Sequence, residues 1–104
     1  MAEETLKENV KCTIESYHRL WDVLDREDRA HLLFICQLPY KQRKSITLMD
    51  NGGYSSKEAT TILGFTEQRS FERLRAKALK RVLAILNSSK HNAYYSEILL
   101  KNCG

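Results

Sequence analysis

The residues of this 104-residue chain that are best suited to chemistry with a partner are long polar side chains between positions 67 and 73. Arginine can bridge N7 and O6 of guanine, glutamine can pair with N7 and N6 of adenine, and glutamate can accept from N4 of cytosine. Such side chains reach base edges when they lie in the first turns of a helix that enters the DNA major groove. The sequence therefore predicts a base-reading group made of Glu67, Gln68, Arg69, Glu72 and Arg73.

Positive charge gathers around this group. The net charge of the chain is +4, but residues 1–37 carry −3 and residues 38–90 carry +7, while the remaining tail is neutral. A basic segment of this kind is typical of a surface that faces phosphates. The side chains predicted to hold phosphates of the DNA backbone are Lys41, Arg43, Lys44, Lys57 and Lys77.

Two helices joined by a glycine turn are predicted to position these side chains. Ser55 and Glu58 have the spacing of a capping box, which opens a short helix. Gly64 tolerates the positive φ of a sharp turn, and Thr66 is predicted to cap a long helix over residues 67–86. This layout is that of a helix-turn-helix. The apolar stripe expected on the long helix comprises Phe71, Leu74, Ala78, Leu79, Val82, Leu83 and Leu86.

The rest of the chain also has helical periodicity. We expect one helix from Glu3 to about Leu24, a second that opens at Asp28 and ends at Leu38-Pro39, and a third over residues 40–49. A polar break over residues 87–92 and a short helix over residues 93–100 follow. The predicted fold class is all-α, a small bundle of five to six helices that contains the helix-turn-helix.

We expect a single domain with three parts. Residues 1–37 are interpreted as acidic helices for packing or dimerisation, residues 38–86 as the DNA-binding core and residues 87–104 as a tail with a short helix. The scarcity of glycine and of proline, which occurs once, argues against an all-β chain.

Part of the chain resembles region four of bacterial sigma factors, the domain that recognises the promoter −35 element. The resemblance covers residues 38 to about 83 and rests on Leu38-Pro39, Arg43, Leu48, Gly53, Ser55, Glu58, Leu63-Gly64 and Arg73-Leu74. It implies that residues 67–73 form the recognition surface, that Lys57 contacts DNA and that RNA polymerase is a partner. The chain departs from the family pattern at Ala59-Thr60 and at Ser70. Residues 63–73 are also similar to the second helix-turn-helix of the arabinose-regulator family, so the subfamily stays open.

Other classes of function are disfavoured by spacing. Cys12, His18, His31 and Cys36 do not form the close ligand pairs of zinc motifs, and no nucleophile with a base and an orienting group is visible. We therefore expect no metal, no cofactor and no enzyme activity. The odd number of cysteines, the lack of a secretory signal and the lack of an apolar run of membrane-spanning length favour a cytoplasmic protein without a membrane partner. The resemblance to sigma region four implies a bacterial or phage protein.

The sequence thus predicts a sequence-specific regulator of transcription that binds double-stranded DNA. A homodimer is favoured, because two-fold dimers double the contacts of a lone helix-turn-helix. At 104 residues the chain leaves no room for the sigma domains that melt a promoter, so we expect an isolated regulator. The alternative is a protein-interaction module that docks on RNA polymerase or a sigma factor with little DNA contact of its own.

Overall fold

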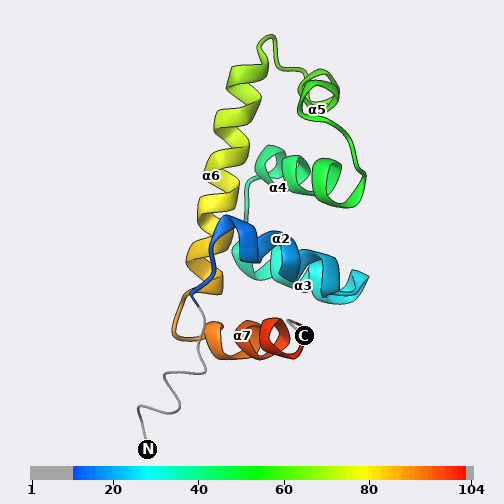
Figure 1. Cartoon of the computed structure of the whole chain (residues 1–104). Coiled ribbons are helices and arrows are strands. Elements are labelled where there is room, and N and C mark those ends of the chain that lie inside the picture. Colours follow the sequence, from blue (N-terminus) through cyan, green and yellow to red (C-terminus); the bar gives the residue numbers. More distant parts are fainter. Residues whose placement is uncertain (1–10, 103–104) are drawn as a thin grey trace, which may run out of the picture.

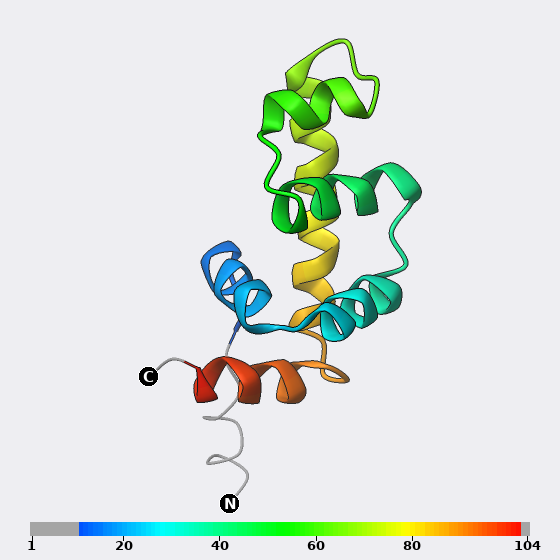
Figure 2. The ribbon, with the colours of Figure 1, turned by 90° about the vertical axis from the view of Figure 1, so that its right-hand side faces the viewer.

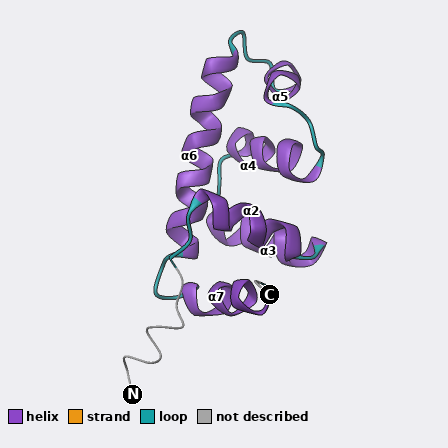
Figure 3. Cartoon of the chain, viewed as in Figure 1, coloured by secondary structure: helices purple, strands orange, loops and turns teal. Residues whose placement is uncertain are grey.

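The computed structural model describes residues 11–102, and within them the chain is helical, with no strand (Figures 1 and 3). The elements are α2 (Ile14–Val23), α3 (Arg26–Cys36), α4 (Tyr40–Ile46), the π-helical turn η1 (Thr47–Asn51), α5 (Ser56–Ile62), α6 (Gln68–Leu86) and α7 (Asn92–Lys101). The predicted small all-α bundle is confirmed.

Helix α6 is the axis of an elongated molecule, with extents of 53 × 22 × 20 Å. Helices α4 and α3 pack on successive parts of α6, α5 lies at its N-terminal end, and α7 lies with α2 at its C-terminal end (Figures 1 and 2). The apolar stripe expected on α6 faces inward, because four of its members are buried and the other three are half-buried.

One hydrophobic core joins the acidic and the basic parts of the sequence. Tyr17 from α2, Leu32 from α3, Ile46 from α4, Val82 from α6 and Tyr95 from α7 belong to one buried cluster. At about 25 cal/mol per Å² of buried apolar surface, this shared cluster is the main stabilising term, so the three parts of the chain fold together.

The first helix begins later than predicted. Residues 11–13 are not helical, and α2 starts at Ile14 with Thr13 as its N-cap, so the predicted continuous helix from Glu3 is wrong at this point. The reason is a tertiary contact: the side chain of Asn87 accepts from the Cys12 backbone N–H at 2.7 Å and donates to the Cys12 carbonyl at 3.0 Å. The part of the prediction over residues 3–10 lies outside the described residues.

Two further helix starts differ from the prediction. Helix α3 begins at Arg26 because the Asp25 carboxylate accepts from the Asp28 backbone N–H at 2.8 Å, so Asp25 and not Asp28 is the cap. Helix α6 begins at Gln68, one residue later than expected, and its N-cap is Glu67 rather than Thr66. The third helix runs beyond its predicted end, because the π-helical turn η1 carries it to Asn51.

Candidate nucleic-acid interface

Local sequence chemistry fixes both the start of α5 and the short turn that joins α5 to α6. The Ser55 hydroxyl accepts from the Glu58 backbone N–H at 3.1 Å, and the Glu58 carboxylate accepts from the Ser55 backbone N–H at 2.9 Å, as the predicted capping box requires. These bonds lower the pKa of the Glu58 carboxyl. Gly64 adopts a φ of +79°, which an L side chain rarely tolerates. The direction in which α6 leaves α5 is therefore set by residues within the turn.

Packing behind the turn holds the start of α6 against α4. Phe71 is fully buried and meets the Phe65 ring edge to face, with the two ring centroids 6.2 Å apart. The Lys41 ammonium from α4 lies over the Phe65 ring, 5.0 Å from the centroid of that ring. Lys41 is thus placed beside the turn, next to the N-terminal end of α6.

The exposed side of α6 carries a basic stripe, which we define as Arg69, Arg73, Lys77 and Lys80. At 3.6 residues per turn these four positions fall on one face, opposite the buried Phe71, Ala78 and Val82. The stripe is about 16 Å long at 1.5 Å per residue. Within the described residues none of the four makes an ion pair.

Two of the other three predicted base-reading residues, Gln68 and Glu72, are engaged within the protein. The Gln68 amide donates to the Glu72 carboxylate at 2.9 Å, and the Ser56 hydroxyl of α5 donates to the same carboxylate oxygen at 3.2 Å. Glu72 therefore fastens the start of α5 to the first turn of α6. Glu67 is exposed at the N-cap, and its side chain makes no capping bond.

The five predicted phosphate-binding residues do not gather in one place. Lys77 belongs to the basic stripe, Lys57 lies on the exposed side of α5, and Lys41 lies beside the turn. The Lys44 ammonium lies over the Tyr40 ring, and Arg43 lines a groove between α3 and α4. The structure thus places Lys77 in the stripe and Lys41 beside the turn that precedes α6, with Lys57 on α5 and Arg43 and Lys44 elsewhere on α4.

Sequence reasoning missed the polar network behind this surface. The Asp50 carboxylate in η1 accepts from the Arg75 guanidinium at 3.1 Å and from the Tyr17 hydroxyl at 2.8 Å, and the Asp50 carbonyl accepts from the Trp21 indole N–H at 3.2 Å. The Arg75 guanidinium also donates to the Ser45 carbonyl at 3.2 Å. Burial, with the nearby Asp50 charge, raises the pKa of Tyr17. The network fastens α2 and η1 to the middle of α6, and no local spacing in the sequence indicates it.

Some of the basic segment is structural rather than available to a partner. Arg75 is neutralised by Asp50, and the Arg81 guanidinium donates to the Cys36 carbonyl at the end of α3 at 3.2 Å. Cys36 is buried, and this burial raises the pKa of its thiol to about 11. The solvent-facing positive charge of α6 is therefore concentrated in the four stripe residues.

Comparison with protein-family models, curated proteins and solved structures found no match to this chain. Among the described residues, no cluster of three or more histidine, cysteine or acidic side chains could hold a metal ion. None of the helices in residues 11–102 combines the length and apolarity needed to cross a membrane. The described part of the chain is thus an all-α bundle with a basic stripe on the exposed side of α6.

Proposed function

We propose that this chain is a sequence-specific double-stranded-DNA-binding regulator of transcription, in which α5 and α6 act as a helix-turn-helix. The observation that carries the proposal is the basic stripe on α6. Its side chains face solvent over the first turns of the helix, where they are free to enter the major groove, while the opposite face is buried. The short α5, the positive-φ turn at Gly64 and the internal bonds of Glu72 support the same reading, because they hold α6 rigidly relative to α5.

Within this interface the arginines and the lysines of the basic stripe contact different parts of the duplex. Arg69 and Arg73 lie nearest the N-terminus of α6, and each can bridge N7 and O6 of a guanine. Lys77 and Lys80 lie farther along the helix, where the duplex presents its backbone. Lys41 of α4 lies over the Phe65 ring in the turn before α6, and Lys57 is exposed on α5. Gln68 and Glu72 act as positioning residues, since their polar atoms already bond within the protein.

The test is a selection from a random duplex pool with the whole chain, followed by titration of the selected duplex at several salt concentrations. The logarithm of the affinity should fall linearly with the logarithm of the salt concentration, because phosphate contacts release counterions. Arg69→Ala should cost about 1–3 kcal/mol and relax the selection at one base position. Lys77→Ala should weaken binding to all duplexes alike and reduce the salt slope by about 1.

Lys90→Ala is the matched control, because Lys90 is exposed and belongs to the basic segment but lies in the turn before α7. It removes the same charge as Lys77→Ala and should leave the salt slope unchanged. The proposal fails if no duplex binds at low salt, or if the Lys77 and Lys90 variants lose the same affinity.

A further inference from the structure

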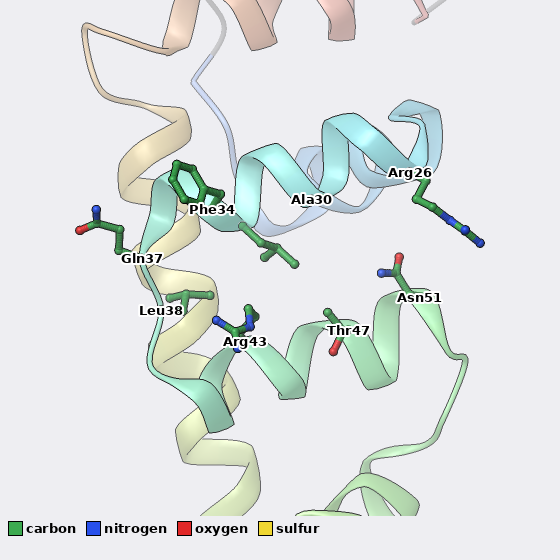
Figure 4. Close-up of a pocket in the computed structure, with 9 residues that line it drawn as sticks. Arg26, Ala30, Phe34, Gln37, Leu38, Arg43, Thr47 and Asn51 are labelled. Carbon is green, nitrogen blue, oxygen red and sulfur yellow. The ribbon is translucent and has the colours of Figure 1, made fainter.

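A groove lies between α3 and α4, with chiefly apolar walls and a volume of about 520 Å³. Both helices pack on α6 but make little contact with each other, so the space between them is open to solvent. Two residues with small side chains, Ala30 of α3 and Thr47 at the start of η1, lie on opposite walls of the groove (Figure 4). Such a volume is in the range of natural binding sites.

The floor of the groove is apolar, and a large aromatic side chain stands beside it unburied. Leu33 and Leu38 are buried beneath the groove, and Phe34 on its α3 wall is 74% exposed. A single exposed apolar residue is ordinary on a protein surface. Phe34 is different because it borders an apolar hollow, and this combination is typical of a surface that binds another chain.

The charged residues that line the groove are of one sign. Arg26 and Arg43 are its charged lining residues in the described chain, and they lie toward opposite ends, Arg26 near Asn51 and Arg43 near Leu38 (Figure 4). Both guanidinium groups lack a carboxylate partner within the described residues. The α3 wall from Arg26 to Gln37 is about 16 Å long, which equals about three turns of helix.

We propose that the groove between α3 and α4 binds an acidic amphipathic segment of another protein, about three helical turns long. Apolar side chains three or four residues apart cover Phe34 and fill the hollow over Leu33, and carboxylates at the two ends meet Arg26 and Arg43. This is the helix-in-groove mode of recognition. The positive charge of Arg26 and Arg43 disfavours a basic segment of the same shape. The inference does not depend on DNA binding.

The experiment selects twelve-residue peptides from a random displayed library against the whole chain and measures the enriched peptides by fluorescence anisotropy. We expect enriched peptides to carry large apolar residues three or four apart with Asp or Glu toward both ends. Phe34→Ala should weaken them about 30-fold, as for a central aromatic anchor. Tyr94→Ala removes a comparably exposed aromatic outside the groove and should have no effect. The Phe34 variant should keep the urea midpoint of the parent chain, because its side chain is mostly exposed.

A charge reversal provides the sharper test. The Arg26→Glu/Arg43→Glu variant should bind the acidic peptides about tenfold or more weakly, and a fresh selection on it should enrich Lys- or Arg-flanked peptides instead. Enriched peptides without acidic residues, or affinity that does not respond to Phe34→Ala, would overturn the proposal. So would a dimer of the parent chain in sedimentation equilibrium that Phe34→Ala dissociates, or peptide binding that appears only after deletion of residues 1–10. Those last two results would assign the groove to a second copy or to the chain's own N-terminal segment.

Discussion

Asp50→Ala should destabilise the chain far more than a typical surface substitution. The side chains of Asp50 and Arg75 are 10% and 12% exposed, and their ion pair is 3.1 Å long. Removing one member of a buried pair leaves the other charge uncompensated, at a cost of about 3–5 kcal/mol. We expect the lower end, about 3 kcal/mol, because Arg75 keeps its bond to the Ser45 carbonyl. For a chain of this size such a loss lowers the melting temperature by about 12 °C or more.

The assay is urea unfolding followed by both circular dichroism and fluorescence. Trp21 is the one tryptophan of the chain, and its indole donates to the Asp50 carbonyl, so fluorescence reports directly on the network. Arg75→Met and the double variant complete a thermodynamic cycle. The double variant should be more stable than the sum of the single losses predicts, by about 2 kcal/mol, because it leaves no unpaired charge. A loss below about 1 kcal/mol for Asp50→Ala, or strictly additive losses, would refute the reasoning.

Three further outcomes follow from single contacts. Asn87→Ala should cost about 2 kcal/mol in urea unfolding, because both backbone groups of Cys12 lose their partner; an unchanged midpoint would contradict this role. The pKa of Glu58 is lowered by its bonds to Ser55, so the stability that it contributes is present above its ordinary range near 4.5 and is lost as pH falls through the lowered pKa. Glu58→Gln should therefore differ from the parent chain most near neutral pH, and the difference in unfolding free energy should shrink as pH falls through the lowered pKa of Glu58. Cys36, with its pKa of about 11, should resist alkylation at about pH 8 in the native chain and react after unfolding, as peptide mapping by mass spectrometry can show.

The features that sequence could predict are those fixed by neighbours along the chain. The Ser55–Glu58 capping box forms between residues three apart, and Gly64 was identified from its turn position and adopts the positive φ expected of it. The stripe of α6 follows from helical periodicity, since its apolar side had to face a core. Local chemistry therefore sufficed for the helix pair and for the exposed positions of Arg69 and Arg73.

The features that sequence missed depend on contacts between distant residues. The backbone of Cys12 bonds to the side chain of Asn87, which is 75 positions away in the sequence. Periodicity along the chain does not indicate this contact, so it predicts a first helix that begins too early. The position of Glu72 on the helix predicts a base contact, but its carboxylate accepts a hydrogen bond from the Ser56 hydroxyl of α5. Asp50 falls just before the glycines that end the helix, where a polar residue is expected for local reasons. Its partners are visible only once the fold brings α2 and α6 together.

The two proposed surfaces lie on different sides of α6. The basic stripe points away from the side of α6 on which α3 and α4 pack, and the groove lies between those two helices. A duplex on the stripe therefore leaves Phe34 uncovered, and a peptide in the groove leaves Arg69 and Arg73 exposed. The Asp50–Arg75 ion pair ties η1, which continues one wall of the groove, to the helix that carries the stripe. If both proposals hold, a DNA duplex and an acidic protein segment therefore do not compete for the same surface of this core.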